Sequence, residues 1–316
     1  MTTAMLLHLC ARVAGACAAD TVDRIGGALG LLAWALGLRR QVASQTLSIA
    51  LGPLSHYRRR RLLRRAYATM GANFLGLLYV GARGPAVLQG VEIAAPQHFQ
   101  QQVARHPGVV WVTPHLGNWD IGAAVLAAAH GRLQVYARPQ GGVVFNAWVT
   151  QLRESLGFSV IMSAHGDRRG AVSAMRGLRS GIPLGLLADQ GPRPERGVGA
   201  WFLGQAVSCH AGPGHFAWSC GVPAGTGACL RRRAGCYRFY HSALQQPTAF
   251  PSQEALLQRL LDQLSCLIAC APGQYFWQHR RFKYAMAAPS RPHPDGWRDP
   301  QVLRYSGGVK DGAKGE

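Results

Sequence analysis

Apolar and polar positions alternate with two different periods along the middle of the chain. Short apolar runs rich in β-formers occur at 109–112, 135–137, 158–162 and 184–188. Segments whose apolar residues recur at helical spacing lie between these runs, at 119–130, 144–156 and 170–179. Strands that alternate with helices indicate βαβ units. We therefore predict an α/β fold with a mainly parallel central sheet flanked by helices.

The N-terminal part of the chain is apolar but interrupted by charges. Residues 6–19 are apolar except for His8 and Arg12, and residues 25–38 contain no charged side chain. A spanning helix needs about 20 apolar residues, so both runs are short. A buried helix fits these runs, and so does a helix lying in a membrane interface. We interpret residues 1–45 as an apolar segment that associates with a membrane.

A basic amphipathic helix is predicted at 56–80. Its apolar positions recur at helical spacing, and its N-terminal end contains the run Arg58 to Arg61. No acidic residue occurs anywhere between Ile25 and Val91. Such a helix is typical of a surface that contacts anionic lipid, although an ordinary helix docked on its own domain has the same pattern.

Charge and cysteine content restrict the partners further. The 34 Lys and Arg residues outnumber the 14 Asp and Glu residues, for a net charge of +20, which favours an anionic partner. No zinc finger and no pattern of stacking aromatics accompanies the arginines, so we expect a membrane surface and no nucleic acid. The eight cysteines include no C-x-x-C pair, and we expect no metal and no cofactor.

The first polar cluster follows the apolar run 109–112 and reads His115-Leu-Gly-Asn-Trp-Asp120. Gly117 permits a tight turn, and Asn118 is suited to cap the helix that follows. A loop that doubles back would bring the side chains of His115 and Asp120 together. A carboxylate that holds one imidazole nitrogen leaves the other nitrogen free to act as a base.

The second polar cluster, Asp189-Gln190, follows the apolar run 184–188. Parallel strands bring their carboxyl ends to one edge of the sheet, where sites form in α/β proteins. We therefore expect Asp189 to converge on the first cluster, together with Arg153 from the helix 144–156. Asp189 would hold Arg153 or the acceptor in place. A surface ion pair between Arg153 and Asp189 is the simpler alternative.

Five blocks of the sequence, in the same order, resemble a known family. They are His115–Asp120, then Val135–Pro139 with Asn146–Trp148 and Arg153–Gly157, then Ala188–Gln190 with Gly197, Trp201–Gln205 and Gly212–Pro213, then Gly221–Arg232, and finally Gln274–Lys283. The chain resembles the bacterial lipid A late acyltransferases of the lauroyl and myristoyl type, within the wider glycerophospholipid acyltransferase group. The resemblance covers roughly residues 39–283.

The resemblance implies an acyltransferase domain at 46–283. Residues 284–316 contain prolines, glycines and scattered charges with little apolar periodicity, which predicts a mobile tail. The expected reaction moves a fatty acyl chain from acyl carrier protein or coenzyme A to a hydroxyl of a lipid or glycolipid, at the cytoplasmic face of a bacterial inner membrane. His115 would act as general base, oriented by Asp120. Backbone N–H groups of Gly117 and Asn118, or the Arg153 guanidinium, would stabilise the oxyanion.

Two features leave the acceptor open. Asp120 stands where the lipid A enzymes tend to have Glu, and residues 45–53 depart from the pattern usual before the basic helix. Another glycolipid or a polar molecule could therefore replace lipid A as acceptor. A degenerate, non-catalytic adaptor at the membrane surface is a further alternative. A thioesterase or lipase is disfavoured, because we find no G-x-S-x-G nucleophile elbow.

Overall fold

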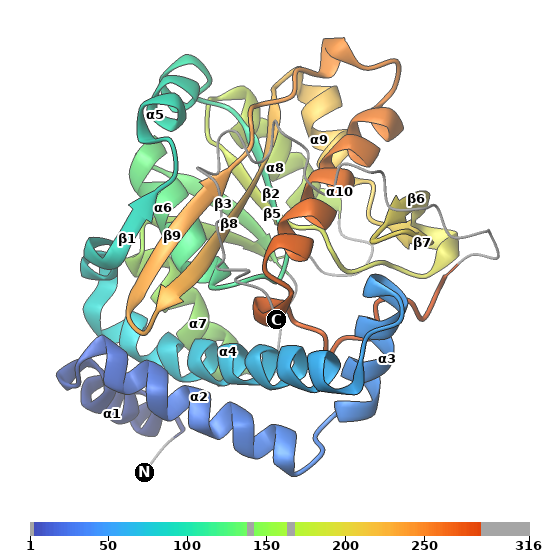
Figure 1. Ribbon diagram of the computed structural model, residues 1–316. Coiled ribbons are helices and arrows are strands. Elements are labelled where there is room, and N and C mark those ends of the chain that lie inside the picture. Colours follow the sequence, from blue (N-terminus) through green and yellow to red (C-terminus); the bar gives the residue numbers. More distant parts are fainter. Residues whose placement is uncertain (1–2, 138–141, 163–167, 286–316) are drawn as a thin grey trace.

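The computed structural model describes residues 3–137, 142–162 and 168–285, and a seven-stranded sheet occupies its centre (Figure 1). The strands of this sheet are β1 (Val91–Ile93), β2 (Val110–Thr113), β3 (Leu133–Ala137), β4 (Phe158–Met162), β5 (Leu184–Leu187), β8 (Ala224–Arg233) and β9 (Cys236–His241). Their spatial order is β1-β9-β8-β2-β5-β3-β4. All neighbours are parallel except β8 and β9. The predicted α/β fold with a mainly parallel sheet is confirmed.

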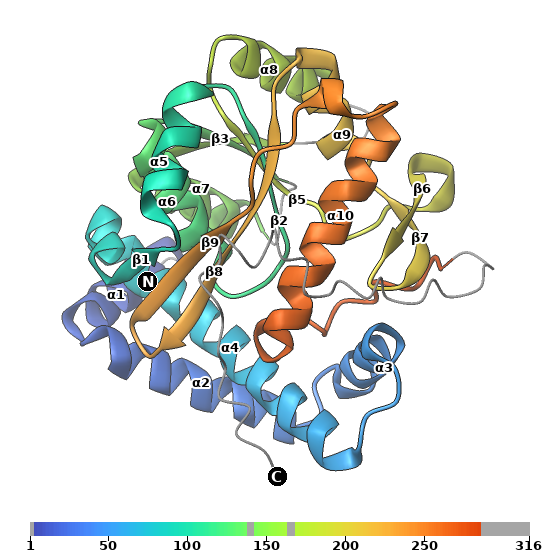
Figure 2. The ribbon, with the colours of Figure 1, turned by 45° about the horizontal axis from the view of Figure 1, so that its top comes forward.

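Helices cover both faces of the sheet (Figures 1 and 2). One face carries α5 (Pro96–Arg105), α6 (Trp119–His130) and α7 (Val143–Ser155), and the other carries α8 (Arg168–Arg179), α9 (Gly212–Cys220) and α10 (Gln253–Cys270). A separate antiparallel pair, β6 (Val198–Phe202) and β7 (Gln205–Cys209), lies beside α10. Short 3₁₀ segments are η1 (Gly84–Gly90), η2 (Pro194–Arg196), η3 (Pro247–Ala249) and η4 (Pro272–Gln274).

The central strands are buried on both sides, which explains their continuous apolar runs. Val110 and Val112 pack into the cluster formed with α8, α9 and α10. Val109 and Trp111 pack into the opposite cluster, with α5, α6 and α7. Successive side chains of a strand point to opposite faces, so one short segment contributes to both halves of the core.

The N-terminal region forms a helical layer below the sheet (Figure 1). It consists of α1 (Thr3–Ala16), α2 (Ala19–Ala35), α3 (Arg40–Leu51) and α4 (His56–Arg83). The Oγ of Ser55 accepts a hydrogen bond from the Arg58 amide and caps α4. This helix covers the predicted segment 56–80 and ends three residues later, before Gly84.

Glycines hold α2 against α4 at backbone contact. A Cβ at Gly30 would lie 2.0 Å from the carbonyl oxygen of Tyr67, and one at Gly71 would lie 2.2 Å from that of Gly26. Even alanine is therefore too large at this crossing. Small residues four apart, such as Gly26 and Gly30, allow this close packing, which is frequent between helices in membranes.

Among the described residues, no single helix is long and apolar enough to cross a bilayer. Helices α2 and α3 reach the length and composition of a span only together, and a bend of 95° separates them. Helix α3 runs across residue 45, where the N-terminal segment is predicted to end. The structure describes only residues 284 and 285 of the predicted tail, and residues 286–316 lie outside the described part of the chain.

Candidate active site

His115 and Asp189 lie next to each other, just beyond the carboxyl ends of two neighbouring strands. Strands β2 and β5 are parallel neighbours, and the last residue of one, Thr113, is level with the last residue of the other, Leu187. The Ala188 amide continues this ladder by donating to the Thr113 carbonyl at 3.2 Å. Two residues beyond the end of each strand stand His115 and Asp189, so the register of the sheet brings their side chains together.

Asp189 contacts His115 at two points. The Nδ1 of His115 lies 2.6 Å from the Oδ1 of Asp189, and the His115 backbone amide donates to Oδ2 at 3.1 Å. Burial opposes ionisation of Asp189, but Arg281 and His115 outweigh it and hold its pKa well below the ordinary value. An ionised carboxylate accepts the Nδ1 proton, which assigns Nε2 as the basic nitrogen of the neutral ring. The Gln190 side-chain nitrogen lies 3.4 Å from Nε2.

Arg281 completes a buried group of three. Its Nη2 lies 2.9 Å from the Oδ2 of Asp189, and its Nη1 donates to the Asp189 carbonyl at 2.7 Å. The Arg281 side chain is 1% exposed, and its Cζ lies 4.4 Å from the centre of the Tyr275 ring. Buried charges are tolerated when they are paired and hydrogen-bonded. Arg281 therefore keeps Asp189 ionised and fixed in place.

Asp120 does not hold the imidazole. Its Oδ1 accepts a hydrogen bond from the Nε of Arg153 at 3.0 Å. The predicted pairs, His115 with Asp120 and Arg153 with Asp189, are therefore wrong, because the two carboxylates exchange partners. The physical reason is that α6 starts immediately after Asn118, whose Oδ1 accepts from the Ile121 amide at 3.1 Å. This start places Asp120 in the first helical turn, facing α7.

The loop amides after His115 are already hydrogen-bonded. The Gly117 amide donates to the Gln274 carbonyl at 3.1 Å, and the Asn118 amide donates to the Cys229 carbonyl at 2.8 Å. The expectation that these two N–H groups stabilise an oxyanion is wrong in this arrangement. They shape the loop instead.

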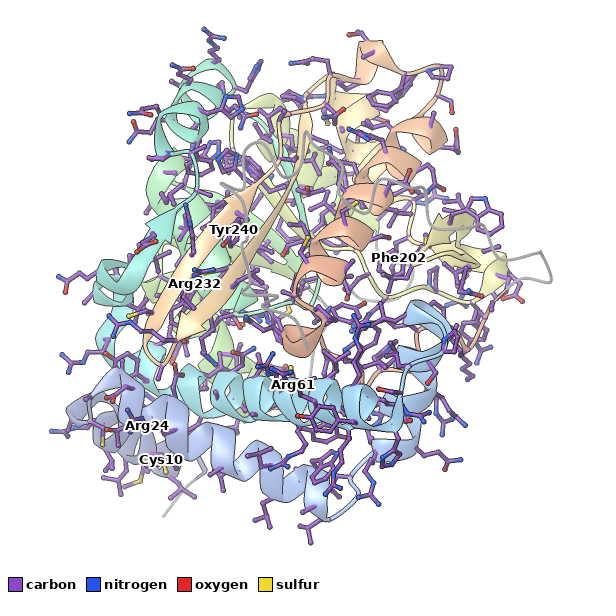
Figure 3. All side chains as sticks on the ribbon, in the orientation of Figure 1. Cys10, Arg24, Arg61, Phe202, Arg232 and Tyr240 are labelled. Carbon is purple, nitrogen blue, oxygen red and sulfur yellow. The ribbon has the colours of Figure 1, made fainter. Side chains whose placement is uncertain are left out.

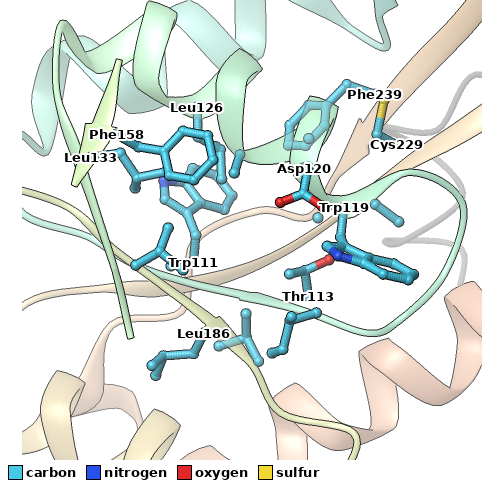
Figure 4. A pocket seen from close by; sticks show the side chains of 18 of the residues that line it. Trp111, Thr113, Trp119, Asp120, Leu126, Leu133, Phe158, Leu186, Cys229 and Phe239 are labelled. Carbon is cyan, nitrogen blue, oxygen red and sulfur yellow. The ribbon is translucent and has the colours of Figure 1, made fainter. Parts of the chain in front are cut away.

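A narrow apolar cavity of about 40 Å³ adjoins these groups (Figure 4). Asp120 and Arg153 are the charged residues in its lining, and Trp119 lines it while packing edge-on against the His115 ring, with centroids 5.0 Å apart. The remaining lining is largely apolar and includes Trp111, Leu126, Leu133, Phe158, Leu186 and Phe239. The carboxylate of Asp120 faces this apolar space in Figure 4.

Within the described part of the chain, no group of three or more His, Cys, Asp or Glu side chains is arranged to hold a metal ion. All eight cysteines are free thiols.

Comparison with known proteins identifies the family. A family model described as bacterial lipid A biosynthesis acyltransferase matches residues 3–284. The chain belongs to this family. A lipid A biosynthesis lauroyltransferase of Escherichia coli is 23% identical over 83% of this chain and 85% of its own length. A phosphatidylinositol mannoside acyltransferase of Mycolicibacterium smegmatis is 28% identical over 53% of this chain and 54% of its own. One of Mycobacterium tuberculosis is 26% identical over 58% of this chain and 57% of its own.

The candidate site includes one buried charge that the sequence pattern does not assign. Arg281 lies in the block 274–283 that supports the family resemblance, but the pattern contains no feature that singles it out from Arg280. Arg280 is exposed, whereas Arg281 is buried against Asp189. The contact joins residues 92 positions apart, which local periodicity cannot detect.

Proposed function

We propose that this protein transfers a fatty acyl chain from a thioester to a hydroxyl group of a lipid or glycolipid acceptor. The observation that carries the proposal is the position of His115. Its Nδ1 is held by an ionised Asp189, and its ring packs on Trp119 at the lining of an apolar cavity. A base beside an apolar cavity matches an acyl donor, and the family supports the reaction class.

In the proposed step, the Nε2 of His115 takes the proton of the acceptor hydroxyl, and the hydroxyl oxygen attacks the thioester carbon. The C–S bond then breaks, and the imidazolium returns the proton to the thiolate. Asp189 stabilises the positive ring in the transition state, and such proton transfer typically contributes about 10²–10⁴-fold to the rate. Arg153 keeps Asp120 in place with its Nε and offers its terminal N–H groups to the oxyanion.

The acceptor that we propose is a glycolipid of the lipid A type. The match to the lauroyltransferase spans most of both chains, which supports this class. A mannosylated phosphoinositide is a second candidate, favoured by the 26% and 28% identity to the two mycobacterial proteins over about half of the chain. The donor is an acyl thioester of acyl carrier protein or coenzyme A. Both are anionic, as the charge of +20 would favour.

The cytoplasmic face of a bacterial inner membrane is the proposed location. An apolar row on α1 and α2 is unusually exposed, and exposed apolar patches mark contact surfaces. It consists of Met5, Leu6, Leu9, Val13, Ile25, Leu29, Leu32 and Leu36, each 46% exposed or more. Three guanidinium groups, those of Arg40, Arg60 and Arg64, gather within 5.8 Å of the Trp34 ring beside this row. Arg24 and Arg61 mark α2 and α4 in Figure 3.

An open apolar groove supports an approach of lipid from this layer. The groove lies between α2 and α4 and has a volume of about 570 Å³. Phe276 and Gln278 line it together with residues of both helices. The Phe276 ring also packs against the His115 ring, with centroids 6.2 Å apart. A lipid chain in the groove would therefore approach the base from the membrane side.

Two measurements test the proposal. Mass spectrometry of lipids from cells with and without the protein should reveal one acylated species that depends on it. Purified protein should transfer lauroyl from acyl carrier protein or coenzyme A to that acceptor. His115→Ala should abolish transfer with a retained melting temperature, while His106→Ala, at the end of α5, should behave as wild type. Transfer by His115→Ala at the wild-type rate would rule out His115 as the base, whereas absence of transfer by the wild type itself would leave the adaptor as the better description.

A further inference from the structure

A second buried ion pair lies away from the reacting groups. Asp23 on α2 and Arg231 on β8 are joined at 3.1 Å between Oδ2 and Nε, and their side chains are 6% and 12% exposed. The Gly235 amide donates to the same carboxylate at 2.7 Å. Burying two charges costs free energy that the pair recovers only with good geometry. An acid inside an apolar N-terminal helix therefore calls for an explanation.

The contacts of Arg231 lead from this pair to the catalytic loop. Its Nη2 donates to the Oδ1 of Asn73 on α4 at 3.0 Å and to the hydroxyl of Tyr237 at 2.9 Å. The Nδ2 of Asn73 in turn donates to the carbonyl of Gly117 at 2.5 Å. Asn73 is 6% exposed. A continuous set of polar contacts thus joins α2 to the backbone two residues after His115.

The loop at Gly117 depends on neighbours for its conformation. Gly117 has a φ of +62°, and a Cβ there would lie 2.0 Å from the Cys229 carbonyl oxygen. Gln274, whose carbonyl holds the Gly117 amide, also binds Arg231, since its side chain makes two 2.9 Å hydrogen bonds with the Arg231 backbone. Both polar groups of the Gly117 backbone are therefore held by residues that contact Arg231.

We propose that Asp23, Arg231 and Asn73 are positioning residues that hold the His115 loop in its active conformation, so that turnover depends on docking of α2. The inference rests on the proposed function and deepens it, because α2 also carries the exposed apolar row assigned to the membrane. Displacement of α2 would remove the partner of Arg231. Arg231 would then lose its alignment on Asn73, and the Gly117 carbonyl would lose its donor. The N-terminal helices are on this view part of the acyltransferase machinery and not an anchor alone.

Substitutions on one helix separate this role from a general effect of charge. Asp23→Asn should lower kcat by about 10-fold or more, since small displacements at a reacting centre carry such penalties. The KM for lauroyl-coenzyme A, with vesicles of bacterial glycolipid as acceptor, should change less than about twofold, because the cavity is unaltered. The matched control is Asp20→Asn. Asp20 lies on the same helix in an exposed pair with Arg24 at 3.3 Å, and its loss should leave kcat unchanged.

Asn73→Asp tests the link to the loop itself. The aspartate still accepts a hydrogen bond from Arg231, but it cannot donate to the Gly117 carbonyl. A positioning role predicts a fall in kcat comparable with that of Asp23→Asn, measured below the melting temperature, which should also fall because a carboxylate oxygen then faces the Gly117 carbonyl. A purely structural role predicts retained kcat, because the buried pair with Arg231 persists.

Hydrogen exchange supplies a readout that requires no activity. Amides of residues 116–122 should exchange faster in Asp23→Asn and Asn73→Asp than in wild type or Asp20→Asn. If exchange there is unchanged, or if kcat of both variants stays within twofold of wild type, the proposal is wrong. Because exchange is measured without substrate, a failed acyl-transfer assay would count against the proposed function and leave this inference to be judged separately.

Discussion

The edge of the sheet and the N-terminal helical layer both carry charge, but they handle it in opposite ways. At the edge, His115, Asp189 and Arg281 are buried and paired, and Asp120 is bonded to Arg153. In the layer, Arg58 to Arg61 have no ion pair among the described residues, and three of the four are exposed. Arg60 of this run also lies over the Trp34 ring, together with Arg40 and Arg64.

This difference indicates how each region acts. Paired and buried charges fix geometry, and salt screens them little. Exposed charges without partners act through their field, which falls off over roughly 8 Å at physiological ionic strength. Substitutions at the edge should therefore change turnover at any salt concentration, whereas substitutions in the layer should change membrane binding and depend on salt.

The exchange of carboxylate partners can be tested at the edge. Asp189→Asn should reduce turnover by about 10²–10⁴-fold, as loss of an oriented base does, and Asp120→Asn should reduce it less. Asp189→Asn should also destabilise the fold by about 3–5 kcal/mol, since it leaves Arg281 buried without a counter-charge. Thermal melts and steady-state rates measure both effects. If Asp189→Asn does not fold, Asp189→Glu is the variant to measure. It keeps the negative charge for Arg281 but displaces the carboxylate from His115, so turnover should still fall.

The stability that ionised Asp189 contributes through its pairing with Arg281 and His115 depends on pH. The pKa of Asp189 in the fold lies below its unfolded value of about 3.9, so its stabilisation is present above that pH and lost as pH falls through the folded pKa. The gap in melting temperature between wild type and Asp189→Asn should be widest near neutral pH and narrow in acid. A larger turnover loss for Asp120→Asn than for Asp189→Asn would restore Asp120 as the partner of His115.

Substitutions of Arg153 test whether the Asp120–Arg153 pair takes part in the reaction. Arg153→Ala should lower turnover by about 10²-fold, as expected for misplaced substrate, and should also lower the melting temperature, because it leaves the buried carboxylate of Asp120 without its partner. Arg153→Lys should recover only part of the loss, because a point charge does not replace a planar fork. Arg179→Ala on α8 is the control and should leave turnover unchanged. The loss of turnover in Arg153→Ala should be the same in low and high salt. Turnover within twofold of wild type would reduce the Asp120–Arg153 pair to a structural contact.

The apolar cavity, with a volume of about 40 Å³, is little larger than one water molecule, so changes in its lining should shift the preferred acyl chain length only slightly. Ala123→Leu adds bulk to the lining and should favour shorter chains, while Leu126→Ala enlarges the cavity and should favour longer ones. Each buried methylene contributes about 0.8 kcal/mol, so relative kcat/KM should shift by about fourfold per carbon. Ala128→Leu, on the exposed side of α6, is the control. Competition between thioesters of different acyl length measures this shift. If all three variants change the preferred length in the same direction, the cavity does not select the acyl chain.

The arginines of the layer should have the smallest effect on chemistry. Replacing Arg58 to Arg61 by Gln should weaken binding to anionic vesicles, by up to about 1 kcal/mol per charge at low salt. Turnover of a detergent-dispersed acceptor should stay within twofold. The control removes four charges elsewhere, at Arg105, Arg132, Arg176 and Arg179. Flotation with neutral and anionic vesicles measures binding, and equal, salt-independent binding to both would contradict an electrostatic role.

The elements of the fold were within reach of sequence alone because their signals are local. Helix α6 and strand β4 begin and end where the pattern predicts, at 119–130 and 158–162. The caps Asn118 and Gly131 and the alternation of apolar runs lie within a few residues of the elements they delimit. The same local reasoning identified His115, Asp120, Arg153 and Asp189 as polar residues at the ends of strands and on adjacent helices.

The partners of those residues were decided by tertiary structure. Asp189 reaches His115 because Thr113 and Leu187 are level in the sheet, and no feature of either segment encodes that register. Arg281 and Arg231 meet their carboxylates across long stretches of chain, for which periodicity carries no information. Hydrophobic spacing depends on a residue and its near neighbours, whereas an ion pair depends on which backbones the completed sheet and helices bring within a few ångströms. The sequence by itself therefore determined the central strands and helices and the candidate side chains, and only the fold determined which carboxylate contacts His115.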